Sequence, residues 1–188
     1  MFELGNALKV SHDYMEQIIQ PGDTVIDATV GNGKDTLFLA GLVGETGHVF
    51  GFDVQPLALE RTREKLEAAG LSGRVTLVCD GHQHMEQYAA FGIRFAAFNL
   101  GYLPGADKQV TTMTDTTLAA IEAALRLLAP KAMCSVCVYP GHEEGRRELE
   151  AVFRLLSSLD ARKYTVIHRN FINQPKNPPE LFSVWTNF

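Results

Sequence analysis

The sequence has few cysteines, no long apolar run and no excess of positive charge. Its 188 residues include three cysteines, an odd and small number that fits reduced thiols rather than a disulfide framework. No apolar run approaches the roughly 20 residues that a membrane span needs, and no charged-then-apolar leader precedes the first motif. These absences predict a cytoplasmic protein that does not bind a membrane.

Metal-binding patterns are also scarce. Cys134 and Cys137 form a C-x-x-C, but they lie in the strand-like run 132–138, where a spacing of three places them on opposite faces. His82 and His84 stand close together without a third ligand in sequence reach. We therefore predict no metal site, and we interpret these two cysteines as buried small hydrophobic residues.

The net charge of −5 does not indicate nucleic-acid binding, although the charge is unevenly distributed. Residues 126–176 contain nine Lys and Arg against five Asp and Glu, so this segment carries +4 and the remainder −9. A local basic face and a mixed, solvated surface both fit these counts, and composition alone favours the mixed surface. The length and the 46% hydrophobic content suit a single domain over residues 1–188.

What the sequence does contain is a strand, a glycine turn and a helix start at 24–35, reading T-V-I-D-A-T-V-G-N-G-K-D. Its apolar, β-branched beginning predicts a buried strand, Gly31 and Gly33 break the strand, and Asp35 is predicted to cap the helix. The glycines allow the backbone to approach a ligand closely, and the free N–H groups of the helix start point toward it. A ligand site is therefore expected here, although an ordinary tight turn would look similar.

Two residues of this stretch bear on the identity of the ligand. A dinucleotide fingerprint needs Gly or Ala three residues after the second glycine, where this chain has Thr36. Asp27, at the end of the predicted strand, would repel a pyrophosphate but could accept hydrogen bonds from the ammonium group of an amino acid. The stretch therefore favours S-adenosylmethionine over NAD, and its D-x-x-x-G-x-G pattern resembles motif I of the class I methyltransferases.

Acidic residues follow the next two predicted strands. Asp53 lies twenty residues after Gly33, where a doubly wound fold places the carboxylate that accepts the ribose hydroxyls. In the methyltransferase pattern, an acid at the position of Asp80 accepts a hydrogen bond from the adenine amino group. Neighbouring side chains, here that of His82, pack on the adenine ring in this pattern.

The fourth predicted strand, 93–99, ends in N-L-G-Y-L-P-G at the carboxyl edge of the sheet, where open α/β folds bind their ligands. Enzymes that methylate amino nitrogens commonly carry here an Asp or Asn, two intervening residues and an aromatic ring. Asn99 and Tyr102 match those ends, but Leu100-Gly101 replaces the usual Pro-Pro, which weakens the inference to an amine acceptor. A loop with a packed tyrosine is the alternative.

The remaining segments complete an α/β pattern. Helices are predicted over residues 2–20 with Ser11 as the N-cap, 56–69, 114–128 and 143–158, and strands over 48–53, 74–79, 132–138, 164–171 and 181–186. The last two strands form a closing hairpin. The fold class is therefore α/β: a Rossmann-like methyltransferase fold with a seven-stranded, mostly parallel sheet, an antiparallel last strand and helices on both faces.

Six segments together resemble one family: K-V-S-H at 9–12, D-A-T-V-G-N-G-K-D-T at 27–36, F-D-V-Q at 52–55, D-G-H at 80–82, F-N-L-G-Y-L-P-G-A-D-K at 98–108 and N-Q-P-K-N-P-P-E at 173–180. This is the small bacterial family labelled putative rRNA methylase (YtqB-like), and the resemblance covers nearly the whole chain. Family members include a tRNA methyltransferase that adds the methyl group to 5-aminomethyl-2-thiouridine at the anticodon wobble position. The resemblance thus implies S-adenosylmethionine as the cofactor and the anticodon stem-loop of tRNA as the partner.

The site residues expected on this pattern fall into three groups. The cofactor is expected to contact Asp27, Thr29, Gly31, Asn32, Gly33, Asp35, Asp53, Gln55, Asp80, Gly81, His82 and Asn99. The expected catalytic residues, which would hold and orient the acceptor amine, are Asn99, Leu100 and Tyr102. Substrate contacts are expected from His12, Tyr102, Arg146, Arg169 and Lys176.

Other functions stay open at this point. A methyltransferase acting on ribosomal RNA or on a small amine fits the same motifs, whereas an NAD-dependent oxidoreductase is opposed by Asp27 and Thr36. A non-catalytic cofactor-binding module fits less well, because the acceptor motif is present beside the cofactor acids. A chain of this size could form a homodimer to build a wider surface for tRNA.

Overall fold

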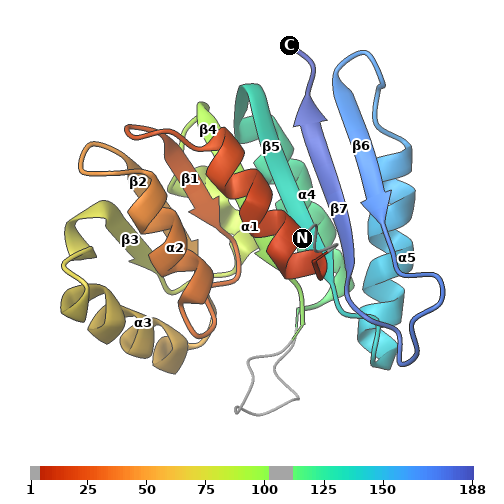
Figure 1. Ribbon diagram of the computed structural model, residues 1–188, viewed down its shortest axis with the longest axis horizontal. Helices are drawn as coiled ribbons and strands as arrows, with labels where there is room; N and C mark the ends of the chain where they lie inside the picture. The colour runs from red at the N-terminus through yellow and green to blue at the C-terminus, as the bar shows by residue number, and fades with distance from the viewer. Residues whose placement is uncertain (1–4, 102–111) are drawn as a thin grey trace.

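The computed structural model describes residues 5–101 and 112–188, and in these residues seven strands form one sheet in the order β3-β2-β1-β4-β5-β7-β6 (Figure 1). The strands are β1 (Thr24–Asp27), β2 (His48–Phe52), β3 (Val75–Val78), β4 (Ile93–Asn99), β5 (Leu128–Val138), β6 (Tyr164–Arg169) and β7 (Glu180–Thr186). The helices are α1 (Ala7–Ile18), α2 (Lys34–Leu42), α3 (Pro56–Ala68), α4 (Thr114–Leu127) and α5 (Glu143–Ser157), with short 3₁₀ turns η1 (Ser72–Arg74) and η2 (His82–Gln87).

The order and polarity of the strands confirm the predicted Rossmann-like α/β fold. β1 pairs in parallel with both β2 and β4, so the chain runs outward from β1 to β3 and then returns to the other side of β1. β7 pairs antiparallel with β5 and with β6, as the closing hairpin predicted. The reversal between β1 and β4 is the point at which open sheets of this kind form a ligand crevice at their carboxyl edge.

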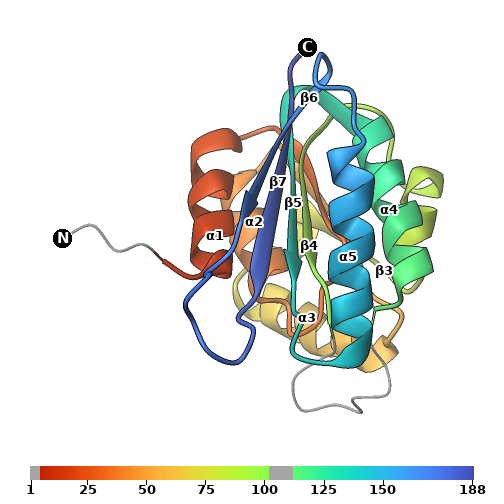
Figure 2. The ribbon, with the colours of Figure 1, turned by 90° about the vertical axis from the view of Figure 1, so that its right-hand side faces the viewer.

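Helices cover both faces of the sheet, so the strands are apolar on both sides (Figure 2). On one face, Ile121 of α4 and Val152 of α5 belong to the larger apolar core. On the other, Met15 of α1 and Leu39 of α2 belong to a second core. No helix of the described residues has the length and apolar content that crossing a bilayer requires.

The two cysteines of the C-x-x-C are buried on opposite faces of β5, as their spacing predicted. Cys134 lies in the core beneath α4 and α5, whereas Cys137 packs with Ala7 and Val10 of α1. Burial raises the pKa of each thiol to about 12, so both stay protonated near neutral pH. They act as small apolar residues of the core.

The prediction that Ser11 caps the first helix is wrong. The described helix begins at Ala7, and the side chain of Asn6 accepts a hydrogen bond from the Lys9 N–H at 2.9 Å. Ser11 lies one turn inside the helix on its buried face, where its hydroxyl is 2.7 Å from the hydroxyl of Ser135 on β5. Both residue types cap helices well, and contact with the sheet decides which one does so here.

Candidate active site

A cavity of about 1060 Å³ opens at the carboxyl edge of the parallel strands. One end is lined by residues that follow β1, β2 and β3, and the other by residues that follow β4 and β5. The residues that line the cavity include these predicted site residues: Thr29, Gly31, Asn32, Asp35, Asp53, Gln55, Asp80, Gly81, His82, Asn99 and Leu100. Sequence positions from 29 to 100 thus meet in one space, because parallel strands end at the same edge.

The glycine turn lies between β1 and α2. Gly31 and Gly33 both have positive φ, +51° and +73°, a conformation that side chains disfavour. A Cβ on Gly33 would also lie 2.5 Å from the hydroxyl oxygen of Thr62 on α3. Gly33 therefore allows α2 and α3 to approach each other behind the turn, and it does not line the cavity itself.

The backbone of this turn is already bonded to a carboxylate. The Gly31 N–H donates to Asp53 Oδ2 at 2.8 Å, and the Gln55 N–H donates to Asp53 Oδ1 at 2.9 Å. Each carboxylate oxygen can accept a further bond, so Asp53 is held in place with acceptors to spare. A pyrophosphate at this turn would meet a fixed negative charge instead of the free Gly31 N–H.

The structure does not support direct contact between Asp27 and the cofactor. Asp27 is fully buried and does not line the cavity. Its carboxylate accepts from the Thr29 N–H at 3.1 Å and from the Thr36 hydroxyl at 2.6 Å. Burial, and after it the charge of Asp35, raises the pKa of Asp27 to about 7. Asp27 supports the turn from below, and the sequence could not show this because burial depends on how α2 packs on β1.

Asp35 also differs from its predicted role as a helix cap. The helix begins at Lys34, two residues before the predicted start at Thr36, and its N-cap is Gly33. Asp35 lies in the first turn, where its side chain faces the cavity and two other elements. Its Oδ1 is 2.8 Å from His12 Nε2, and its Oδ2 accepts a hydrogen bond from the side-chain nitrogen of Asn99.

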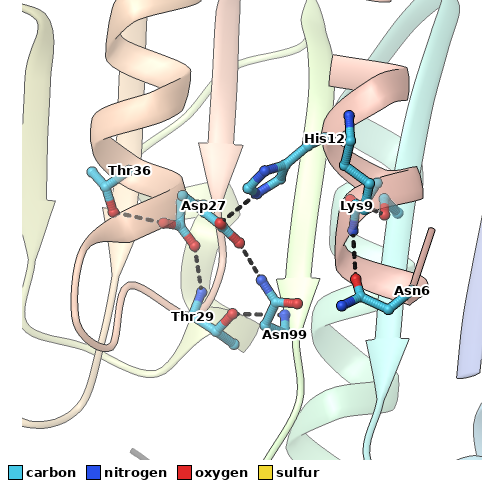
Figure 3. A network of polar contacts seen from close by, with 10 residues as sticks. Asn6, Lys9, His12, Asp27, Thr29, Thr36 and Asn99 are labelled. Carbon is cyan, nitrogen blue, oxygen red and sulfur yellow. Dashed lines mark hydrogen bonds and ion pairs between the residues drawn. The ribbon is translucent and has the colours of Figure 1, made fainter. Parts of the chain in front are cut away.

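Asn99 is therefore fixed through both its backbone and its side chain. Its backbone N–H donates to the Thr29 hydroxyl at 2.8 Å, and its amide nitrogen donates to Asp35. Figure 3 shows His12 and Asn99 pointing toward one another from α1 and from the end of β4. His12 contacts Asp35 and is not among the residues that line the cavity, so its predicted substrate contact stays a prediction.

The adenine end of the predicted site carries Asp80 and His82. The Asp80 carboxylate accepts from the Gly81 N–H at 2.7 Å and from the Tyr88 hydroxyl at 3.0 Å, and it lies 2.9 Å from His84 Nδ1. The hydrogen bond with His84 is the main cause that lowers the pKa of Asp80. Burial lowers the pKa of His82, whose Nδ1 donates to the Ala28 carbonyl at 3.1 Å. His82 thus presents a neutral ring to the cavity.

The predicted RNA contacts lie outside the cavity. Arg146 is exposed in the first turn of α5, Arg169 ends β6, and Lys176 is exposed in the loop before β7. The start of α5, the end of β6 and the loop before β7, which carry these residues, lie at the same edge of the sheet as the ends of β4 and β5 (Figure 1). Tyr102, predicted both to contact substrate and to take part in catalysis, lies outside the described residues.

Sequence reasoning missed several residues that line the end of the cavity formed after β4 and β5, where the acceptor amine is expected and which we call the acceptor end. Tyr139 and His142 follow β5, and Asn177 reaches the cavity from the loop before β7. Burial raises the pKa of Tyr139, so its hydroxyl stays protonated. The rule that identified Asn99, a polar side chain at the carboxyl end of a buried strand, also identifies Tyr139, which follows β5.

Among the described residues, no group of three or more His, Cys, Asp and Glu side chains is placed to hold a metal ion.

The family model described as "Putative rRNA methylase" matches residues 49–184 of this chain. Among proteins of described activity, the chain is similar to the chloroplastic tRNA (mnm(5)s(2)U34)-methyltransferase of Arabidopsis thaliana. The two are 40% identical over 97% of this chain and 70% of the plant protein.

Two solved structures are similar to this chain in both fold and sequence. A putative rRNA-methylase from Clostridium thermocellum superposes with a TM-score of 0.97 at 43% identity, covering 98% of this chain and all of that one. The putative methyltransferase SMU.1697c from Streptococcus mutans, solved in complex with SAH, gives a TM-score of 0.89 at 38% identity over 98% and 99% of the two chains.

Proposed function

Because this chain belongs to the putative rRNA methylase family, we propose that it methylates the amino nitrogen of 5-aminomethyl-2-thiouridine at the wobble position of tRNA, with S-adenosylmethionine as the methyl donor. The observation that carries this proposal is the fixed amide of Asn99 at the junction of the two ends of the cavity. The wobble substrate is taken from the plant relative, which is similar over nearly the whole chain.

The charged and polar side chains that line the cavity fit this cofactor. Three carboxylates, those of Asp35, Asp53 and Asp80, line a space in which a ligand with a sulfonium and an ammonium group would find opposite charge. Asp53 has acceptors left for ribose hydroxyls, and the neutral ring of His82 would pack on adenine. When bound, S-adenosylmethionine supplies a methyl group activated by the sulfonium sulfur.

The acceptor amine needs to be neutral and correctly aimed. A free alkyl amine with a pKa of about 10 is mostly protonated at neutral pH, and removal from water lowers that pKa. The Asn99 side-chain oxygen and the Leu100 carbonyl, from two residues that line the cavity, would accept the N–H bonds of the neutral amine and leave its lone pair for the methyl group. Alignment of the reacting atoms then carries much of the catalysis. Tyr102 is proposed to wall this pocket.

We assign the RNA-binding surface to the edge around the cavity mouth. Arg146, Arg169 and Lys176 would contact phosphates, and Lys34 adds a cation at the cavity wall. A wobble base in the anticodon loop is unpaired, so it can be splayed into the cavity without opening a duplex. A homodimer would widen this surface, and a monomer that binds and methylates tRNA with full activity would contradict the dimer.

The decisive experiment is nucleoside mass spectrometry of tRNA from cells lacking this methyl group, after incubation with the protein and S-adenosylmethionine. We expect 5-aminomethyl-2-thiouridine to be converted to its methylaminomethyl form, and Asn99→Ala to abolish the conversion. Binding of S-adenosylhomocysteine without conversion would contradict the tRNA substrate and move the search to ribosomal RNA and small amines.

A further inference from the structure

The side-chain amide of Asn99 can present either of two groups to a bound amine. Its oxygen can accept a hydrogen bond from the N–H of the amine. Its nitrogen is only a donor, so it cannot form a hydrogen bond with an amine N–H. The structure resolves this choice through Asp35, since an ionised carboxylate has no proton to donate. Asp35 Oδ2 therefore accepts a hydrogen bond from the side-chain nitrogen of Asn99, so the side-chain oxygen of Asn99 is available to a ligand in the cavity.

Asp35 is in turn held by His12, which comes from a different element. His12 Nε2 lies 2.8 Å from Asp35 Oδ1, and the His12 ring stacks on Phe38 with centroids 4.6 Å apart and planes 23° apart. Phe38 and Asp35 are three residues apart on α2, so one face of that helix provides both contacts. The ring of His12 thus has a fixed position and direction.

We propose that His12 is a positioning residue that acts through Asp35 to keep the Asn99 side-chain oxygen directed at the acceptor amine. This inference rests on the proposed methylation of an amine. His12 contacts Asp35 and is not among the residues that line the cavity, so we infer that its effect passes through the Asp35 carboxylate.

A second consequence concerns the charge of the site. Without His12, the Asp35 carboxylate would keep one oxygen unbonded beside the acceptor end of the cavity. A carboxylate near an amine favours the ammonium form, which has no lone pair and cannot attack the methyl group. A hydrogen-bond donor to Asp35, such as His12, therefore favours the correct orientation of the Asn99 amide. It also favours the neutral form of the acceptor amine.

The test compares His12→Leu with His12→Gln, because the glutamine amide can replace the Nε2–H donor while leucine cannot. We expect His12→Leu to lower kcat about tenfold through misalignment of the amine, with the Kd for S-adenosylhomocysteine unchanged. His12→Gln should keep most of the wild-type kcat. His48→Leu is the matched control, since His48 bonds to Thr76 at the opposite edge of the sheet.

Unchanged kcat in His12→Leu would overturn the inference, as would equal losses in the leucine and glutamine variants. A weaker affinity for S-adenosylhomocysteine as the main defect would also overturn it, because His12 would then act on the cofactor.

An NMR measurement separates this inference from the substrate assignment. The ¹⁵N–¹H₂ signal of the Asn99 side chain, assigned by its loss in Asn99→Ala, should shift in His12→Leu and stay near its wild-type position in His12→Gln. An unmoved signal in His12→Leu would contradict the positioning role. If the signal behaves as expected but wild-type protein leaves tRNA unmethylated, the proposed substrate fails and the positioning of Asn99 stands.

Discussion

The two ends of the cavity are built from different kinds of bonds. At the cofactor end, backbone N–H groups of Gly31, Gln55 and Gly81 hold the carboxylates that follow β2 and β3. At the acceptor end, side chains hold other side chains, as in the bond between Asn99 and Asp35, which are 64 residues apart. The hydrogen bonds to Asp53 come from backbone N–H groups, which are present whatever the side chain, whereas the bond between Asn99 and Asp35 is lost if either residue changes.

The acceptor end also depends on helices that pack from both faces of the sheet. The Gly101 N–H donates to the Thr112 hydroxyl at 2.9 Å, and that hydroxyl donates to Glu148 of α5 at 2.9 Å. Burial raises the pKa of Glu148, and the Thr117 hydroxyl donates to its second oxygen. We therefore expect cofactor binding to rest mainly on the strand ends, and acceptor specificity to rest on the assembled tertiary structure.

The largest expected effect tests the acceptor end. Asn99→Ala removes the side-chain acceptor for the amine, and we expect kcat to fall by about 100-fold or more. The Kd for S-adenosylhomocysteine, measured by calorimetry, should change less than threefold or so, because the backbone bond to Thr29 remains. Equal losses of turnover and cofactor affinity would erase the distinction between the two ends.

The reciprocal change is Asp53→Ala at the cofactor end. Loss of a charged acceptor for the ribose should weaken S-adenosylhomocysteine binding by about 10- to 100-fold, since such bonds contribute roughly 1.5–3 kcal/mol. At saturating cofactor, kcat should stay within a few-fold of wild type. A variant with normal affinity but lost turnover would contradict the assignment of Asp53 to the cofactor.

Gly33→Ala tests the turn as a structural element. The added Cβ would sit at positive φ and 2.5 Å from the Thr62 hydroxyl, so the free energy of unfolding should fall by about 2 kcal/mol. Gly41→Ala is the matched control, because its Cβ meets nothing within 4 Å and lies within α2. The control should be neutral or stabilising by up to about 1 kcal/mol in denaturant titrations. Equal stability of the two variants would contradict the close packing of α2 on α3.

The buried carboxyl beneath the turn predicts a pH dependence. The folded pKa of Asp27, about 7, lies above its ordinary 3.8, so the folded state binds more protons between these values. The stability that Asp27 contributes is complete below about pH 4 and is lost as the pH rises through 7. Asp27→Asn stays neutral, so its stability relative to wild type should rise by roughly 2–3 kcal/mol between pH 5 and pH 8. A constant difference in unfolding free energy across that range would exclude a raised pKa.

The smallest effect on function is expected from the basic residues outside the cavity, which would contact RNA. Arg146→Ala and Arg169→Ala should each weaken tRNA binding a few-fold and reduce the slope of log K against log salt by about 0.7–0.9. Arg162→Ala is the control, because Arg162 forms an ion pair with Asp160 in the loop before β6, at the opposite edge of the sheet. Filter-binding titrations at several salt concentrations would measure the slopes, and identical slopes for all three variants would contradict this RNA surface.

The order of the elements was readable from local patterns. β4 spans the predicted residues 93–99, and α4 and α5 end within one residue of their predictions, because apolar periodicity and capping residues mark such segments. The carboxyl-edge rule also placed Asp53, Asp80 and Asn99 at one cavity. The sequence was a poorer guide to side chains whose role depends on a distant contact. Ser11, for example, contacts Ser135 of the sheet and does not form the predicted helix cap.

By itself, the sequence determined the strand, glycine turn and helix at 24–42 and the polar residues at the strand ends, since these follow from local conformational preferences. Only the tertiary structure decided that Asp27 is buried, that Asp35 joins His12 to Asn99, and that residues after β5 complete the cavity. Burial and side-chain partners depend on how distant elements pack, and α1, α2 and β4 meet only when the whole sheet has formed.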